Sequence, residues 1–256
     1  MRSLHVIFCL FVISCSFSNL AAQKYYRGHV ALEAVKLYKN AKLQDKLGNK
    51  QLAKQLYKKA LNEDFRYIEA MDKLGDIYRG EGMLDSAVHF YQMSIDREPS
   101  GILAYQNLAA TYQLKGDYRD AVQTYQDLLS LFPTYTEAYF GLGKLFLDKK
   151  DYFSSQFYAN LALKDFLSQK QNSRAADARL LAARSYLADR NYKKAVRYLK
   201  ANKKYTGHKA FHKYYLGLCY MKLGKHVKAE KYLNQAQIMG YQLPVYVKEQ
   251  IELMGA

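Results

Sequence analysis

The chain has 256 residues, of which 50% are apolar and 24% charged, and its formal net charge is +16. This apolar fraction excludes general disorder, and the length allows one or two compact domains or one elongated array of small repeated units. With 3 prolines and 14 glycines, the chain is predicted to be helical with short interruptions. The cysteines are too few for a disulfide framework or a cysteine-based zinc site, since only Cys9, Cys15 and Cys219 are present.

Residues 1–22 are predicted to be a targeting segment. A single positive charge at Arg2 precedes the apolar run from Val6 to Ile13, which is too short to cross a bilayer because a spanning helix needs about 20 apolar residues. The small pair Ala21-Ala22 suits cleavage by a signal peptidase after Ala22.

A second interpretation of the same segment is a lipoprotein signal. The quartet Val12-Ile13-Ser14-Cys15 resembles a bacterial lipobox, in which the signal ends at Ser14 and Cys15 is lipidated. An uncleaved anchor is the third alternative. Both cleaved forms predict an exported protein, either periplasmic or secreted, or an outer-membrane lipoprotein.

A period of 34 residues organises the chain after this segment. The repeated ranges are 34–67, 68–101, 102–135, 136–169, 176–209 and 210–243, with six extra residues before the fifth. The eighth place of every range holds a small residue: Ala41, Gly75, Ala109, Gly143, Ala183 and Gly217. Twelve places later stands a second small column: Ala53, Ala87, Ala121, Ser155, Ala195 and Ala229.

These columns predict pairs of antiparallel helices. Spacings of three and four residues put small and large side chains on one helical face, and a small residue on each helix lets the two axes approach closely. Turn residues are expected between the helices of each pair, glycine in four ranges and a basic residue in two: Gly48, Gly82, Gly116, Gly224, Lys150 and Arg190. Prolines punctuate the ends of ranges at Pro99, Pro133 and Pro244.

The column pattern resembles the tetratricopeptide repeat (TPR) family. The best match is the run Tyr105-Gln-Asn-Leu-Ala-Ala-Thr-Tyr112, followed by Ala121, Tyr125 and Pro133. The resemblance covers residues 34–243 and implies an all-α, right-handed α-solenoid of six helix pairs, with the first helices on the concave face. Residues 244–256 would then hold a C-terminal capping helix, Val245–Met254, because a stack of repeats must shield its last apolar edge.

Helix geometry and this resemblance together predict which side chains face the concave side. In the first two repeats these places are polar with mixed charge: Tyr38, Lys42, Asp45, Lys46, Glu69, Asp72, Asp76 and Arg79. In the last three repeats they are mainly apolar: Phe140, Leu147, Leu180, Leu187, Phe211, Tyr214, Leu218 and Met221, with Lys144 and Arg184 between them. We expect these ten residues to bind a peptide or an amphipathic helix. The alternative is that curvature, or a long connection between the fourth and fifth repeats, buries them.

Positive charge concentrates between Lys193 and Lys231, where Glu230 is the only acidic residue. Such a density attracts polyanions, and for an exported protein an anionic membrane surface or an acidic envelope polymer is expected and nucleic acid is not. The alternative is an ordinary solvated face of the solenoid.

The sequence contains no pattern that predicts catalysis, a cofactor or a metal site. His208 and His212 have a spacing that zinc ligands use, but no third ligand accompanies them. Asp72 and Asp76 are interpreted as an ordinary helix-surface pair, and Cys219 as a buried apolar residue.

The predicted function is a protein-protein interaction scaffold rather than an enzyme, with an unidentified protein bound along the concave face. The alternative is a structural component of an envelope complex, held at a membrane by the basic face or by a lipidated Cys15.

Overall fold

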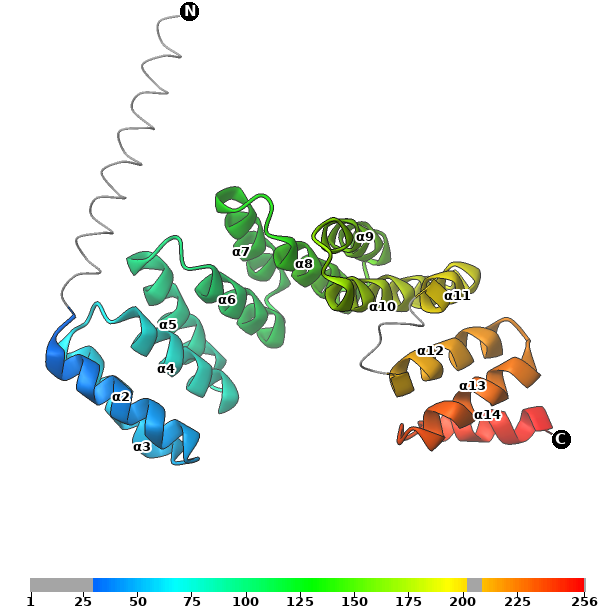
Figure 1. The fold of residues 1–256 in the computed structure, drawn as a ribbon, viewed down its shortest axis with the longest axis horizontal. Helices are drawn as coiled ribbons and strands as arrows, with labels where there is room; N and C mark the ends of the chain where they lie inside the picture. The colour runs from blue at the N-terminus through cyan, green and yellow to red at the C-terminus, as the bar shows by residue number, and fades with distance from the viewer. Residues whose placement is uncertain (1–29, 202–208, 256) are drawn as a thin grey trace, which may run out of the picture. The chain divides into compact units, whose positions relative to one another are not determined.

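The computed structural model describes residues 30–201 and 209–255, so the targeting prediction for residues 1–22 lies outside the described residues. Within these ranges the secondary structure is entirely helical (Figure 1). The helices are α2 (Leu32–Lys46), α3 (Lys50–Glu63), α4 (Ile68–Gly80), α5 (Leu84–Arg97), α6 (Ile102–Lys115), α7 (Tyr118–Leu131), α8 (Thr136–Asp148), α9 (Tyr152–Ser168), α10 (Asn172–Ala188), α11 (Tyr192–Ala201), α12 (Lys209–Lys222), α13 (His226–Ile238) and α14 (Val245–Gly255).

The helices belong to two compact units, and the boundary along the chain lies between Asp117 and Tyr118. Unit 1 contains α2 to α6, and unit 2 contains α7 to α14. Consecutive helices pack as pairs in both units: α2 with α3, α4 with α5, α8 with α9, α10 with α11 and α12 with α13. The predicted all-α class, with the consecutive helix pairs of an α-solenoid, is therefore confirmed.

Both columns of small residues lie buried where paired helices touch. A Cβ atom added at Gly75 of α4 would lie 2.6 Å from the ring of Tyr91 on α5. One added at Gly217 of α12 would lie 2.5 Å from Cγ of Leu233 on α13. Real Cβ atoms do not come this close to a neighbour, so a larger residue at either place would force the paired helices apart.

Ser155 is the one hydroxyl-bearing member of the second small column. Its side chain is fully buried, and its Oγ donates a hydrogen bond of 2.9 Å to the carbonyl of Gly143 on the partner helix. Because a buried hydroxyl costs free energy unless it is hydrogen-bonded, this contact explains why serine can replace alanine here.

The turns within helix pairs use the left-handed backbone region, as the turn residues predict. The glycines there have φ values of 82° at Gly48, 76° at Gly82, 84° at Gly116 and 66° at Gly224. Lys150 and Arg190 adopt the same conformation, with φ values of 62° and 58°, although a Cβ atom disfavours it.

The six extra residues before the fifth repeat, 170–175, do not form a long loop: α10 begins at Asn172, and α9 runs on to Ser168. Both α9 and α10 have 17 residues, and only residues 169–171 connect them. The predicted long connection between the fourth and fifth repeats was therefore wrong. Phe166 and Ala175, near the lengthened ends of α9 and α10, form a separate buried cluster with Ala162 and Ala178.

Helix α14 covers the end of the last repeat. Val247 is fully buried, and Ile251 packs against the same core cluster as Leu233 of α13. This arrangement is the one expected of a capping helix, because the last helix pair of a stack has no following repeat to bury its apolar edge.

Candidate protein-binding surface

The ten residues predicted to bind a partner lie on three neighbouring helices of unit 2. Helix α10 contacts both α8 and α12, so the first helices of successive pairs lie side by side (Figure 1). We call the side that these residues share the first-helix surface of unit 2. Its members are Phe140, Lys144 and Leu147 on α8, Leu180, Arg184 and Leu187 on α10, and Phe211, Tyr214, Leu218 and Met221 on α12.

These residues repeat along each helix at the spacing that keeps side chains on one face. The spacing of three and four residues, as in Leu180, Arg184 and Leu187, returns to the same side of an α-helix after each turn. Three rows of this kind, one on each helix, give a mainly apolar surface with Lys144 on α8 and Arg184 on α10.

Exposure divides the ten residues into three groups. Lys144, Arg184 and Phe211 are exposed, with 44% of the Phe211 surface accessible. Tyr214 and Met221 are buried, with 6% and 8% accessible, and so offer a partner little surface. The remaining five are half-buried and pack against the core from the surface side: Phe140, Leu147, Leu180, Leu187 and Leu218.

The chain itself covers part of α12. Tyr241, in the segment between α13 and α14, packs against Tyr214 with tilted rings whose centroids are 4.4 Å apart, and makes a T-shaped contact with Phe211 at 4.9 Å. Burial, together with a hydrogen bond to Tyr246, raises the pKa of Tyr214 well above its ordinary value. Tyr214 is thus buried by the C-terminal end of the chain, while Phe211 remains partly exposed.

Phe140 is fixed by the lengthened helices α9 and α10. Its ring meets Phe166 of α9 edge-on at 6.3 Å, and the guanidinium of Arg174 on α10 lies 4.8 Å from its centroid. Arg174 pairs in turn with Glu137, and this hydrogen bonding raises the pKa of Arg174. The extra helical turns therefore hold one aromatic residue of the surface in a defined orientation.

Lys144 and Arg184 have no carboxylate partner among the described residues. Arg184 lies over the ring of Tyr215 on α12, 5.7 Å from its centroid, and Lys144 points from the exposed side of α8. An apolar surface with two unpaired cations is complementary to a segment that carries apolar side chains beside carboxylates.

Comparisons with known proteins bear on both the sequence and the fold. Two family models described as Tetratricopeptide repeat match residues 108–152 and 213–237. A tetratricopeptide repeat protein from Parabacteroides merdae has a similar structure, with a TM-score of 0.65 and 18% identity over 95% of this chain and 92% of that chain. These findings support the TPR family. No curated protein matched in a comparison of sequences.

Other solved TPR-like structures show the same fold. PilF of Pseudomonas aeruginosa gives a TM-score of 0.66 and 18% identity, over 85% of this chain and 96% of that chain. PilW, described as a widely conserved type IV pilus biogenesis factor, gives 0.66 and 15%, over 87% and 98%. Likeness at this identity shows the fold alone.

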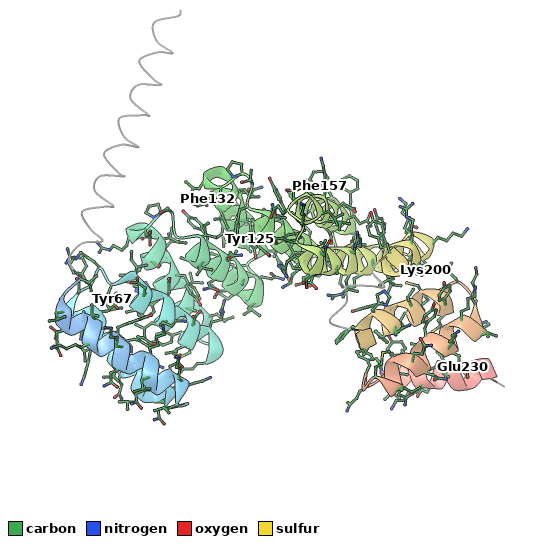
Figure 2. All side chains as sticks on the ribbon, in the orientation of Figure 1. Tyr67, Tyr125, Phe132, Phe157, Lys200 and Glu230 are labelled. Carbon is green, nitrogen blue, oxygen red and sulfur yellow. The ribbon has the colours of Figure 1, made fainter. Side chains whose placement is uncertain are left out.

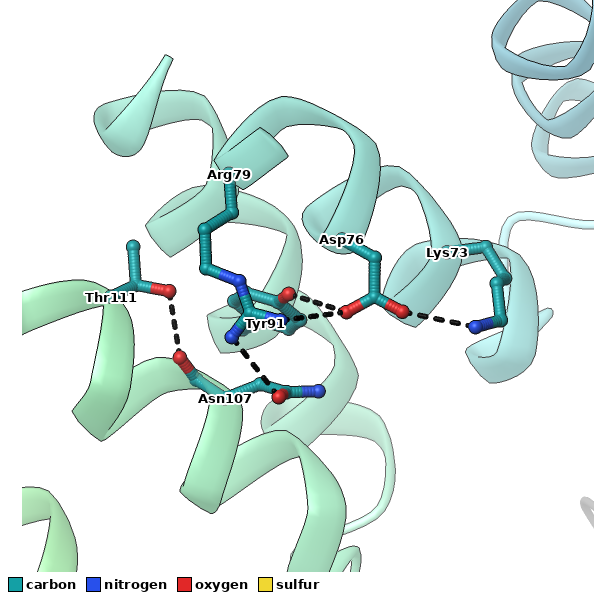
Figure 3. Close-up of polar contacts among 6 residues, drawn as sticks. All are labelled: Lys73, Asp76, Arg79, Tyr91, Asn107 and Thr111. Atoms are coloured by element: carbon teal, nitrogen blue, oxygen red, sulfur yellow. Dashed lines mark hydrogen bonds and ion pairs between the residues drawn. The ribbon is translucent and has the colours of Figure 1, made fainter. Parts of the chain in front are cut away.

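The first helices of the helix pairs in unit 1 carry a polar network instead of an apolar surface (Figure 3). Asp76 of α4 accepts hydrogen bonds from Lys73 Nζ at 3.0 Å and from the Tyr91 hydroxyl at 2.8 Å. Arg79 also contacts Asp76 and donates to Asn107 Oδ1 of α6 at 3.1 Å. The charges of Lys73, Asp76 and Arg79 are thus engaged with one another.

The interpretation of Asp72 and Asp76 as an ordinary helix-surface pair was wrong. Asp76 holds a buried tyrosine hydroxyl, and one carboxylate oxygen of Asp72 is buried without a partner. The repeat frame could have indicated this contact. Asp76 on the first helix and Tyr91 on the second stand fifteen residues apart within one repeat. At the equivalent place Lys42 precedes Tyr57, and the buried Tyr57 hydroxyl has no hydrogen-bond partner.

The histidines and Cys219 form no metal group among the residues that the structure describes. His208 lies outside those residues, and His226 is exposed. His212 is buried and its Nε2 contacts the Leu199 carbonyl, while burial lowers its pKa. Burial raises the pKa of the Cys219 thiol to about 12, so it remains protonated and packs as an apolar residue.

Proposed function

We propose that the protein is a non-enzymatic interaction scaffold that binds an extended peptide or an amphipathic helix on the first-helix surface of unit 2. The TPR-like fold is consistent with a protein-interaction scaffold. The specific site is supported by one observation above all: exposed Phe211 and a row of half-buried leucines lie beside two cations that have no carboxylate partner among the described residues.

This surface is suited to binding because a ligand can gain binding free energy there without breaking contacts within the protein. Each 100 Å² of apolar surface that a partner covers contributes about 2.5 kcal/mol before the costs of association. Carboxylates of the partner beside Lys144 and Arg184 would set its register and direction. The rigid helix pairs add little ordering cost, since the side chains are already held in place.

The solved neighbours include proteins with roles in assemblies. PilW is described as a pilus biogenesis factor, and a further neighbour is Cut9 in the APC/C heterotetramer Cut9-Hcn1, with a TM-score of 0.67 and 16% identity over 87% of this chain and 43% of that chain. By analogy in fold only, we infer that this chain also joins other polypeptides.

Site-specific crosslinking in the full chain tests the proposal. A photoreactive phenylalanine analogue placed at Leu180 or Leu218 should crosslink one polypeptide, and the same analogue at exposed Leu103 of unit 1 should not. The crosslinked segment, made as a synthetic peptide, should bind the purified chain at least tenfold more weakly after Lys144→Glu with Arg184→Glu. Charge reversal at Lys46 and Lys59 is the matched control. Equal crosslinking at both surfaces, or equal affinity of the two charge variants, would contradict the proposal.

We also propose that the protein is exported, on the basis of the N-terminal pattern in residues 1–22, which lie outside the described residues. None of the described helices has the length and apolar character needed to cross a bilayer. Mass spectrometry of the mature N-terminus distinguishes cleavage after Ala22 from an acylated Cys15, and an N-terminus at Met1 contradicts both.

A second candidate function is a structural component of an envelope complex, held at a membrane by a basic face. The observation that favours it is helix α11, where Lys193, Arg197 and Lys200 are exposed, no acidic residue is present, and none of the ion pairs among the described residues includes its cations. This candidate uses the second helices and is independent of the first-helix surface.

A further inference from the structure

We propose that the outward faces of α9 and α11 form one peripheral membrane-binding surface, in which Phe153 and Phe157 enter an anionic lipid bilayer beside the cations of α11. This inference rests on the second candidate function and names its ligand. It shares no residue with the first-helix surface, so its failure leaves the peptide-binding proposal intact.

The two helices lie next to each other. The Tyr198 hydroxyl of α11 donates a hydrogen bond to Asn160 Oδ1 of α9, and Gln156 Nε2 of α9 donates to Asp189 in the turn before α11 at 2.9 Å. Asn160, Gln156 and Tyr198 are half-buried and Asp189 is exposed, so both contacts lie at the edge of the exposed surface. The exposed sides of α9 and α11 therefore continue into each other.

On α9 the exposed side carries two aromatic rings. Phe153 and Phe157 are one helical turn apart and have 82% and 57% of their surface accessible, and Lys164 lies on the same face two turns later. Figure 2 shows Phe157 extending from α9 away from the neighbouring helices. Two phenylalanines exposed this far at adjacent positions mark a contact surface, because isolated exposed apolar residues are ordinary but a paired aromatic patch is not.

On α11 the exposed side is wholly basic. Lys193, Arg197 and Lys200 recur at spacings of four and three residues, which places them on one face, and Lys200 is labelled at the end of this helix in Figure 2. The acidic groups on α9 and the turn are Asp151 and Asp165, at the N-cap and in the last turns of α9, and Asp189, which already accepts a hydrogen bond from Gln156. The field at this face therefore favours an anionic partner.

The combination of rings and cations favours a bilayer over a soluble polyanion. Anionic headgroups attract the lysines and arginine, with about a fivefold gain in binding for each charge near the surface. The boundary between headgroups and acyl chains takes up exposed phenyl rings and removes them from water. The long stems of the lysines can also lie along apolar surface while their charges stay at the headgroups.

The chain contains no tryptophan, so Phe157→Trp supplies a single fluorescent reporter at the proposed surface. The full chain with this change is mixed with vesicles of phosphatidylcholine alone or with a third of phosphatidylglycerol. We expect a blue-shifted emission that brominated lipids quench, only with the anionic vesicles and not in high salt. Phe65→Trp in unit 1 is the matched control, because Phe65 has 58% of its surface accessible, and its emission should not shift.

Charge variants complete the test. In the Phe157→Trp chain, Lys193→Gln with Arg197→Gln and Lys200→Gln should weaken partition about 100-fold, while Lys39→Gln with Lys46→Gln and Lys59→Gln should change it much less. The apolar run at residues 6–13 is present in every variant, so a reporter at position 157 distinguishes insertion of this surface from insertion of that run. The proposal is overturned if the reporter stays in water on vesicles that retain the protein, if no vesicle retains it, or if a soluble polyanion such as heparin or single-stranded DNA binds this face more tightly than the vesicles do.

Discussion

The first-helix faces of the two units are built from the same repeat frame but differ in how they use charge. In unit 1 the carboxylate of Asp76 is engaged by Lys73, Arg79 and Tyr91, so the charges stabilise the protein itself (Figure 3). In unit 2 the equivalent surface is apolar, and Lys144 and Arg184 have no carboxylate partner among the described residues.

This difference shows that the number of charged residues does not identify a binding face. A charge that is already paired within the fold must lose that partner before it can serve a ligand, and the loss offsets much of the gain. Unpaired cations next to exposed apolar side chains carry no such cost. The comparison therefore favours unit 2 as the binding unit, although unit 1 has the more charged surface.

The largest expected effect on stability is at Asp76. Asp76→Ala removes the acceptor of the buried Tyr91 hydroxyl and leaves Lys73 and Arg79 unpaired, so we expect a loss of about 2–3 kcal/mol in the free energy of unfolding. Urea unfolding followed by far-UV circular dichroism measures it.

The matched variants in unit 2 are Lys144→Ala and Arg184→Ala. Because neither side chain has a carboxylate partner, each should change the free energy of unfolding by less than about 0.5 kcal/mol. Equal losses at Asp76 and at these two positions would remove the distinction between a structural charge network and a binding surface.

The second effect should be the same in both units. Gly75→Ala and Gly217→Ala place a Cβ atom within 2.6 Å of Tyr91 and 2.5 Å of Leu233, so each should cost about 2 kcal/mol despite the higher helix propensity of alanine. The control is Gly80→Ala in α4, where a Cβ atom meets nothing within 4 Å and a gain of about 0.5–1 kcal/mol is expected. A loss at Gly80 as large as the loss at Gly75 would indicate a helix effect rather than close packing. Thermal and urea unfolding measure both.

Most of the fold could be predicted because close packing of the paired helices requires a small residue at the same place of every repeat. Gly75 and Gly217 have to be small for a steric reason that acts within one helix pair, so the column is visible without any knowledge of distant contacts. The lengthened helices α9 and α10 were missed because their added residues fall between two repeats, where the 34-residue frame gives no expectation.

The candidate site was less predictable. Periodicity identifies which residues share a face, as for Leu180 and Leu187, but not what else packs on that face. Tyr241 covers Tyr214 from a segment outside the helical period, and no spacing rule relates the two. Likewise the contact between Arg79 and Asn107 joins two repeats, and it depends on side-chain reach that a repeat alignment does not contain.

A smaller effect is expected at Asp72, where burial is the main cause of a raised pKa. The native protein binds the Asp72 proton more tightly than the unfolded chain does. The stability that this protonated carboxyl contributes is therefore complete below the pKa of the unfolded chain, and it is lost as the pH rises through the pKa of the native protein. Asp72→Asn should therefore be about 1 kcal/mol more stable than the parent at neutral pH, and the difference should vanish below the ordinary pKa of an aspartate carboxyl. Urea unfolding at several pH values measures this, and a difference that grows on acidification would contradict it.

The smallest expected effect concerns the turns, where the units also differ. Unit 1 uses glycine at Gly48 and Gly82, but Lys150 and Arg190 of unit 2 adopt left-handed backbone conformations with a Cβ atom present. Lys150→Gly and Arg190→Gly should each remove about 1–2 kcal/mol of backbone strain from the native state. Glycine also raises the entropy of the unfolded chain, which offsets part of this, so the free energy of unfolding should rise by about 0.5 kcal/mol in each case. Lys149→Gly is the control in the same turn. Lys149 has a φ of −68°, so glycine there relieves no strain, adds unfolded-state freedom and removes the contact of Lys149 Nζ with the Phe146 ring, with a loss of about 0.5–1 kcal/mol. If Lys150→Gly and Lys149→Gly shift the urea midpoint in the same direction, the left-handed turn is not a source of strain in unit 2.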